Sequence, residues 1–393
     1  MLTREENELL TRIGPGTPGG ELLRRYWHPV AVIQELTQER PTRFVRLLGE
    51  DLVLFRDAAG RVGLLADHCA HRGASLLYGR VEERGIACAY HGWLYDVEGA
   101  CLETPAEPAE SRFHLTVRQR AYPVQQFLGM YWAYLGPLPA PIIPKYDIWV
   151  RRDGVRKIQV HPMIDCNWLQ ASENSVDPAH LQILHQELTG RGRTPPSTTR
   201  GFTDDIDRFD FYVFPHGIIK KRTYKNGVVD EHPLLFPTVL RVNNSTEIRV
   251  PIDDTHMTIF EPYFFPSPDG AEVDQGETLP VEYLEPFKSP SDQVHPVARF
   301  RWNAVAGQDA AAWETQGAIA NRENERLATS DRGVVLLREV VRDNIARVQE
   351  GLDPLGVIRD PDHGMIDTKL DETLDQMRRR GAGTQIPELA IRA

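Results

Sequence analysis

The chain has 393 residues, 41% hydrophobic and 26% charged, a composition ordinary for a soluble globular protein and long enough for two domains. Its formal net charge is −11 at pH 7 and no basic stripe offsets that charge, so we expect no nucleic-acid partner. No apolar run reaches the length of a membrane span, and the N-terminus lacks the charged and apolar regions of a signal peptide. We therefore expect a cytoplasmic protein without a membrane partner.

The first 40 residues predict helices. Residues 3–13 have an amphipathic pattern in which Thr3 is a suitable N-cap, and residues 14–20 form a loop rich in Gly and Pro. A second short helix is predicted at residues 21–26. We expect residues 1–40 to form N-terminal helices that pack on the C-terminal domain.

Residues 41–145 predict an all-β domain. The hydrophobic period becomes two from Phe44, and a proline-rich stretch at residues 136–144 reads as the linker that ends the domain. Strands are predicted at residues 44–48, 52–55, 62–65, 115–122 and 129–135.

Two Cys-plus-His pairs interrupt this β domain. Cys69-Ala-His71 is followed by sixteen residues and then by Cys88-Ala-Tyr-His91. A zinc site usually opens with two cysteines two to four apart, and haem attachment needs C-x-x-C-H. Two thiolates and two imidazoles on separate turns instead fit a Rieske [2Fe–2S] centre, with structural zinc as the alternative. The other two cysteines do not support a disulfide framework.

A second candidate site lies in residues 165–185. Pro178 cannot continue the preceding helix, and it suits the first position of a new helix with Asp177 as N-cap. His180 and His185 lie on that second helix, where residues five apart diverge by about 140°. Both can reach one metal only if the turn is widened, as in a π-bulge. The alternative is two solvated histidines and a capping aspartate.

The rest of the chain, residues 146–393, mixes helices and strands. Antiparallel strands after helices indicate an α+β domain with one open sheet flanked by helices. Residues 190–201 read as a loop or lid, and residues 266–299 as a surface excursion. Strands are predicted at residues 209–214, 217–224, 238–242, 247–250 and 256–264, and helices at residues 308–326 and 333–350.

Together these patterns resemble the alpha subunits of Rieske non-heme iron oxygenases, most closely the group of phthalate dioxygenases and dehydrodivanillate O-demethylases. The resemblance covers essentially the whole chain. It rests on four segments: the opening from Glu5 to Pro29, Tyr90–Tyr95, Asn174–His180 and Gln308–Gly317. It implies an N-terminal all-β Rieske domain followed by a catalytic α+β domain.

The resemblance also implies a mononuclear Fe(II) centre. Non-heme iron that activates O₂ needs two imidazoles and one carboxylate on one face. His180 and His185 supply the imidazoles, and Asp309 matches the family's carboxylate, although it could instead cap a helix. Glu314 is the second candidate carboxylate. Asn174 matches a position near the iron.

In the family, the cluster of one subunit delivers electrons to the iron of the next within a head-to-tail trimer. An aspartate links a cluster histidine to an iron histidine, and Asp177 and His91 match those positions. Electrons come from a separate NADH-dependent reductase or a ferredoxin. No G-x-G-x-x-G motif for nucleotide binding follows a predicted strand.

The implied function is a terminal oxygenase that inserts oxygen from O₂ into an aromatic, carboxylated or methoxylated substrate, by O-demethylation or hydroxylation. The alternatives are a cis-dihydroxylating phthalate-type dioxygenase, an electron-transfer Rieske protein and a zinc-stabilised binding module. Lys220 and Arg222 share one strand face, opposite to Lys221. They could bind a substrate carboxylate, or they could be solvated cations on an exposed edge strand that prevent it from pairing with another chain.

Overall fold

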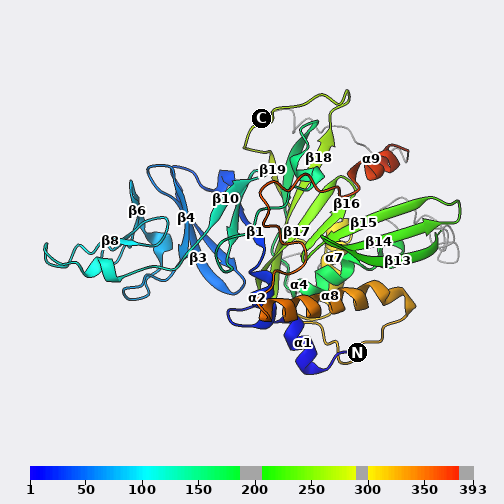
Figure 1. Cartoon of the computed structure of the whole chain (residues 1–393), viewed down its shortest axis with the longest axis horizontal. Coiled ribbons are helices and arrows are strands. Elements are labelled where there is room, and N and C mark those ends of the chain that lie inside the picture. Colours follow the sequence, from blue (N-terminus) through cyan, green and yellow to red (C-terminus); the bar gives the residue numbers. More distant parts are fainter. Residues whose placement is uncertain (186–205, 289–299, 380–393) are drawn as a thin grey trace. The chain divides into compact units, whose positions relative to one another are not determined.

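The structure is a computed structural model that describes residues 1–185, 206–288 and 300–379 (Figure 1). It divides into two compact units, one of residues 24–141 and one that joins residues 1–23 to residues 142–393. The division falls earlier than residue 40, because residues 27–32 form a strand that pairs within the first unit.

The unit of residues 24–141 is built from short strands in three antiparallel sheets. The sheet orders are β1-β11-β10, β2-β3-β4-β9 and β5-β6-β7-β8. The strands are β1 (Trp27–Val32), β2 (Thr42–Leu47), β3 (Glu50–Arg56), β4 (Val62–Ala66), β5 (Arg80–Glu82), β6 (Gly85–Ala87), β7 (Leu94–Tyr95), β8 (Cys101–Glu103), β9 (Ala121–Tyr122), β10 (Val124–Phe127) and β11 (Met130–Tyr134). The strand expected at residues 115–122 instead begins with the 3₁₀ helix η3 (Phe113–Thr116).

The second unit contains an eight-stranded sheet of order β13-β14-β15-β16-β17-β18-β12-β19. The strands are β12 (Gly154–Val160), β13 (Ile206–Phe214), β14 (Gly217–Tyr224), β15 (Val229–Leu235), β16 (Val239–Val242), β17 (Ser245–Asp253), β18 (His256–Pro266) and β19 (Val281–Tyr283). Neighbouring strands are antiparallel except β12 and β19. The predicted α+β class is confirmed.

Three strands of this sheet, β12, β15 and β19, were not predicted from the sequence, and β19 lies in the stretch expected to be a surface excursion. β15 reads Val-Asp-Glu-His-Pro-Leu-Leu, which is too polar at its start to read as a buried strand. It nevertheless lies inside the sheet, paired on both sides, and its Asp230 and His232 are buried. β12 precedes the helices with which we expected the domain to begin.

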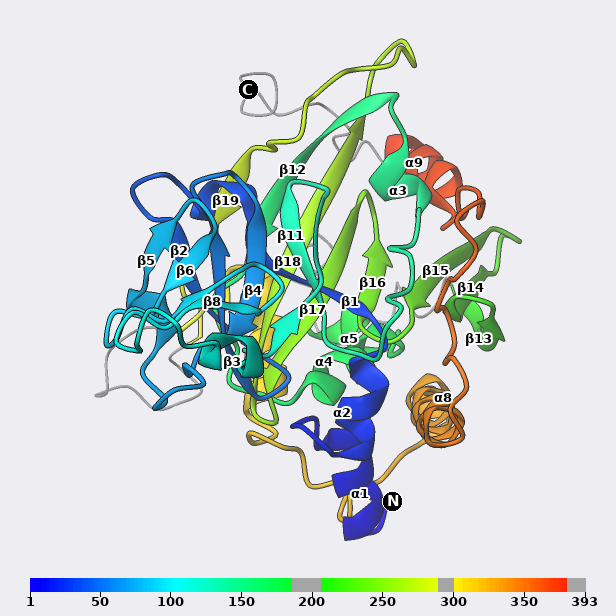
Figure 2. The same cartoon turned by 60° about the vertical axis from the view of Figure 1, so that its left-hand side comes forward.

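Helices cover the sheet and join distant segments. They are α1 (Arg4–Thr11), α2 (Pro18–Leu23), α3 (Asp147–Val150), α4 (Trp168–Ser175), α5 (His180–Ile183), α7 (Val305–Glu314), α8 (Arg332–Gln349) and α9 (Leu370–Arg379). Thr3 caps α1 in a capping box with Glu6. α8 lies against α1 and α2, as Figure 2 shows. The helix α7 is shorter than predicted, and α9 was not predicted.

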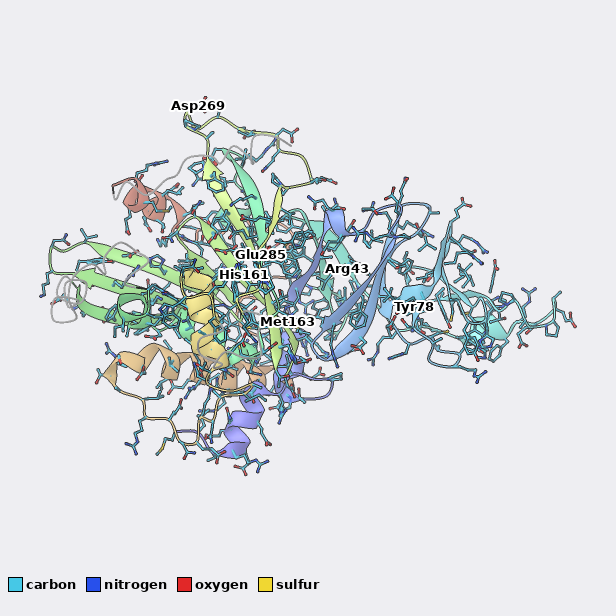
Figure 3. All side chains as sticks on the ribbon, turned by 180° about the vertical axis from the view of Figure 1, so that it is seen from behind. Arg43, Tyr78, His161, Met163, Asp269 and Glu285 are labelled. Atoms are coloured by element: carbon cyan, nitrogen blue, oxygen red, sulfur yellow. The ribbon has the colours of Figure 1, made fainter. Side chains whose placement is uncertain are left out.

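The connection between β18 and β19 leaves the sheet as an exposed excursion, with Asp269 near its tip (Figure 3). The expected lid at residues 190–201 and residues 289–299 lie outside the described residues. Among the described helices, none is both long and apolar enough to cross a membrane.

Candidate metal centres

The first candidate centre is formed by two equivalent loops in the unit of residues 24–141. The Gly73 N–H donates to the Cys69 carbonyl oxygen at 2.8 Å, and the Gly92 N–H donates to the Cys88 carbonyl oxygen at the same distance. Both glycines have positive φ, 77° and 72°, which explains the glycine after each Cys-plus-His pair.

The four side chains of these loops lie in two layers. Cys69 and Cys88 are buried in the hydrophobic core of the domain, whereas His71 and His91 are half-buried. The two imidazole ring centres are 4.6 Å apart, and His71 stacks on Trp93. Inner thiolates and outer imidazoles are the donors that a Rieske cluster needs for its two irons. The donor set therefore fits a [2Fe–2S] group.

Two further side chains surround the thiols. The Tyr95 hydroxyl lies 3.2 Å from Cys69 Sγ, and burial raises the pKa of Tyr95, so the hydroxyl keeps its proton as a donor. Burial also raises the pKa of Cys101 to about 11, and its thiol contacts the Glu103 carbonyl oxygen. All four cysteines are free, in agreement with the predicted absence of a disulfide framework.

The second candidate centre begins where α4 ends. The Asp177 Oδ1 accepts the Ala179 N–H at 2.7 Å, which is the hydrogen bond expected of a capping aspartate, although α5 itself begins only at His180. α5 ends at Ile183, and His185 lies beyond it. The centres of the two imidazole rings are 5.3 Å apart.

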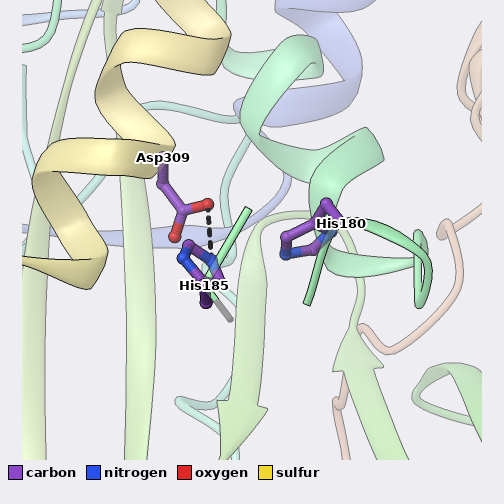
Figure 4. A group of neighbouring side chains, drawn as sticks. All are labelled: His180, His185 and Asp309. Carbon is purple, nitrogen blue, oxygen red and sulfur yellow. Dashed lines mark ion pairs between the residues drawn. The ribbon is translucent and has the colours of Figure 1, made fainter. Parts of the chain in front are cut away.

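Asp309 reaches these histidines from α7. The helix is capped at Ala304, so Asp309 lies inside it and is not its N-cap. Asp309 Oδ1 is 3.1 Å from His185 Nε2. One ligand atom from each of His180, His185 and Asp309 lies within 4.8 Å of the others (Figure 4). Two imidazoles and one carboxylate form the facial donor set of non-heme Fe(II), so this centre fits the implied iron.

Two amide side chains orient these donors. Gln308 Nε2 donates to the Trp302 carbonyl oxygen at 2.9 Å, which leaves Gln308 Oε1 facing His185 Nδ1 at 2.8 Å. His185 Nδ1 therefore carries the proton, and Nε2 is left for a metal. Asn174 Nδ2 lies 3.3 Å from Asp309 Oδ1. Sequence reasoning identified Asn174 but missed the role of Gln308.

Glu314 does not join this centre. Its carboxylate pairs with Lys288 and accepts the Asp165 N–H at 3.2 Å. Asp177, in contrast, does lie beside the second candidate centre, because its Oδ2 is 3.4 Å from His180 Nδ1. Burial alone would raise the pKa of Asp177, but the contacts with His180 and the Ala179 N–H hold it below its usual value. Asp177 is therefore a carboxylate that faces His180 Nδ1.

Charged residues continue onto the neighbouring sheet. β14 lies between β13 and β15, so the idea that Lys220 and Arg222 guard a sheet edge was wrong. Both side chains are buried. Arg222 pairs with Asp230, and its Nη2 lies 2.6 Å from His232 Nε2. Burial lowers the pKa of His232 to about 4, so His232 is neutral in this network.

Comparison with known proteins agrees with both centres. The Rieske [2Fe-2S] domain model matches residues 26–127, and the model described as LigXa C-terminal domain like matches residues 302–367. The chain is 39% identical over 370 residues to the 5,5'-dehydrodivanillate O-demethylase oxygenase subunit of Sphingobium sp. (strain NBRC 103272 / SYK-6), covering 92% of this chain and 84% of that protein. The chain belongs to the oxygenase subunits of the Rieske non-heme iron oxygenases.

Two other relatives are named for chemically different substrates. The phthalate 4,5-dioxygenase oxygenase subunit of Pseudomonas putida is 34% identical over 398 residues, with 91% of this chain and 89% of that one covered. The tert-butanol monooxygenase / tert-amyl alcohol desaturase oxygenase subunit of Aquincola tertiaricarbonis is 50% identical over 375 residues, with 86% and 76% covered. The predicted resemblance is confirmed.

The same fold occurs in a solved structure of the oxygenase of carbazole 1,9a-dioxygenase in complex with ferredoxin. The TM-score is 0.61 at 20% identity, covering 86% of this chain and 95% of that chain. This Rieske oxygenase subunit is an oxidoreductase that uses a [2Fe–2S] cluster and a mononuclear iron.

Proposed function

We propose that this oxygenase subunit inserts oxygen from O₂ into an aromatic, carboxylated or methoxylated substrate, by O-demethylation or hydroxylation. The observation that carries the proposal is the presence of both donor sets in one chain: Cys69, His71, Cys88 and His91 in one unit, and His180, His185 and Asp309 in the other. An electron carrier would need only the first set.

Each side chain has a role in this proposal. Cys69 and Cys88 bind one iron of the cluster, and His71 and His91 bind the other. His180, His185 and Asp309 hold the mononuclear iron on one face and leave its other positions open. When bound, the cluster supplies single electrons and the iron supplies O₂ activation.

Asp177 connects the two centres in the proposed assembly. Its carboxylate already contacts His180 Nδ1, and we propose that it also accepts the N–H of His91 from another copy of the chain. That contact requires head-to-tail packing that closes on itself, and a ring of three copies satisfies it. A separate reductase or ferredoxin then supplies electrons to each cluster. The cytoplasmic location expected from the sequence stays a prediction.

A second candidate function is oxidation of a small branched alcohol. The observation that favours it is the 50% identity to the tert-butanol monooxygenase subunit, which exceeds the 39% identity to the O-demethylase subunit. Both reactions use the same two centres. They differ in the polarity and size of the group held beside the iron.

The test combines the purified iron-loaded protein with a partner reductase, NADH and ¹⁸O₂. Vanillate, phthalate and tert-butanol are offered separately, and products are identified by mass spectrometry. The proposal predicts product from an aromatic acid, with ¹⁸O incorporated into the ring product or the released formaldehyde. Product from tert-butanol alone would establish the second candidate, and a colourless protein with stoichiometric zinc would overturn both.

A further inference from the structure

Lys220 occupies a buried interior position next to the proposed iron centre. It lies on β14, opposite Phe211 of β13 and His232 of β15, and only 4% of the residue is exposed. Paired residues of antiparallel strands point to the same side of a sheet. Phe211, Lys220 and His232 therefore form one row across three strands.

This row lies against the segment that leads to the iron ligands. A Cβ added at Gly333 of α8 would clash with both the Val176 carbonyl oxygen and the Phe211 ring. Phe211 and Val176 thus meet at the start of α8. In addition, the charges of Lys220 and Asp177 influence each other's ionisation. Lys220 therefore lies within electrostatic range of Asp177, the residue that follows Val176 and contacts His180.

The Lys220 ammonium has no hydrogen-bond or ion-pair partner among the residues that the structure describes. The neighbouring charged side chains form ion pairs or hydrogen bonds with other residues. Arg222 pairs with Asp230, and Arg249 Nη2 lies 2.7 Å from Glu247 Oε2. Asp177 is held by the Ala179 N–H and by His180.

An ammonium that is buried without a partner among the described residues is costly, because it loses its hydration without gaining a counter-charge from them. The cost is visible in its acidity: burial, reinforced by the Arg222 charge, lowers the pKa of Lys220 to about 7. A group with such a perturbed pKa beside a reactive centre is a candidate for a functional role.

We propose that Lys220 binds the anionic group of the substrate, a carboxylate held beside the iron centre. The inference rests on the proposed oxygenase function and selects within it: the substrate is an aromatic acid and not a neutral alcohol. A carboxylate supplies both the counter-charge and the acceptor oxygens that the ammonium lacks. Arg222, the second cation that the sequence suggested for this role, already contacts Asp230 and His232 through its Nη2.

Lys221 provides a matched control. It lies on the opposite face of the same strand, is only partly buried, and has Glu231 3.9 Å away. Lys220→Met and Lys221→Met remove the same charge from adjacent positions and replace it with a similarly shaped apolar side chain. Lys220→Gln serves as a second variant that keeps a hydrogen-bond donor.

The experiment measures binding under argon by isothermal titration calorimetry on the iron-loaded protein. Vanillate, phthalate and 4-methoxybenzoate are each compared with the corresponding methyl ester. We expect the wild-type protein to bind at least one acid about tenfold or more tightly than its ester. Lys220→Met should weaken binding of that acid about ten- to hundredfold and leave ester binding within about threefold. Lys221→Met should behave like wild type.

The cluster absorption spectrum and circular dichroism establish that each variant is folded, and the wild-type comparison of acid and ester needs no variant. The proposal is overturned if no acid binds more tightly than its ester, or if folded Lys220→Met or Lys220→Gln binds the acid as wild type does. Oxygenation of tert-butanol by both wild type and Lys220→Met would retain the oxygenase function and overturn the role of Lys220. Binding of the acid through Lys220 without any oxygenated product would retain the role of Lys220 and overturn the oxygenase function.

Discussion

His185 and Gln308 form a hydrogen bond of 2.8 Å between Nδ1 and Oε1, although 123 positions separate them in the chain. Gln308 immediately precedes Asp309, so one turn of α7 supplies both a candidate ligand and the group that orients another. Partners of metal-bound histidines fix the tautomer and typically contribute 10- to 100-fold to metal affinity or activity.

Gln308→Leu should therefore weaken retention of the mononuclear iron by about 10- to 100-fold while the cluster spectrum stays unchanged. The measurement is iron content after dialysis against a graded series of chelator concentrations. Gln316→Leu is the control, because Gln316 is exposed and donates only to the Ala312 carbonyl oxygen just after the same helix. Equal iron retention in the two variants would contradict the orienting role of Gln308.

Asp177→Asn tests the proposed connection between the centres. The Ala179 N–H can still be accepted by an amide oxygen, so the local turn should survive. The anionic acceptor for the imidazoles is lost, and turnover should fall about 10- to 100-fold. Re-oxidation of a pre-reduced cluster by O₂ in the presence of substrate, followed by stopped-flow absorbance, should slow in parallel. A wild-type rate would leave Asp177 with a purely local role.

Tyr95→Phe should lower the reduction potential of the cluster. The Tyr95 hydroxyl donates toward Cys69 Sγ, and hydrogen bonds to cluster sulfurs stabilise the reduced, more negative state. A redox titration followed by visible absorbance measures the midpoint reduction potential of the cluster. Tyr122→Phe is the control, since its hydroxyl bonds to Glu50 in the same unit and not to a cluster ligand. An unchanged midpoint in Tyr95→Phe would show that this hydroxyl does not act on the cluster.

Lys220 predicts a pH dependence of stability. Its pKa is about 7 in the folded protein and 10.5 when unperturbed, so the unfolded chain binds more protons between these values. The free energy of unfolding of the substrate-free protein should therefore rise with pH across this window as the burial penalty of the ammonium fades. Lys220→Met has no such penalty and should be more stable than wild type by about 1 kcal/mol or more near pH 7.

The stability difference between Lys220→Met and wild type should shrink as pH increases from 7 toward 10. Urea denaturation at several pH values measures it, with Lys221→Met expected to show no comparable trend. A difference that is constant with pH would mean that Lys220 is not held as a buried, destabilised ammonium.

The site residues that could be predicted from the sequence are those whose partners lie a few positions away in the chain. Cys69 and His71, or Cys88 and His91, lie within four positions of each other, and their spacing carries the chemistry. Gln308 could not be assigned a partner, because its contact with His185 depends on how α7 packs beside α5.

The sheet illustrates the same limit. Asp230 and His232 made β15 look like a polar connection, because nothing in its own residues shows that Arg222 of β14 neutralises Asp230. The edge role considered for Lys220 failed for a related reason: the number of strands on either side of β14 is a property of the whole sheet.

The two metal centres are tested most directly by the iron content of wild type and His180→Ala, each measured together with its visible spectrum. We expect three irons per wild-type chain, two in the cluster and one at His180, His185 and Asp309. We expect two irons in His180→Ala with the Rieske spectrum intact. Three irons retained in His180→Ala, or loss of the cluster spectrum together with the mononuclear iron, would contradict two separate centres built from these residues.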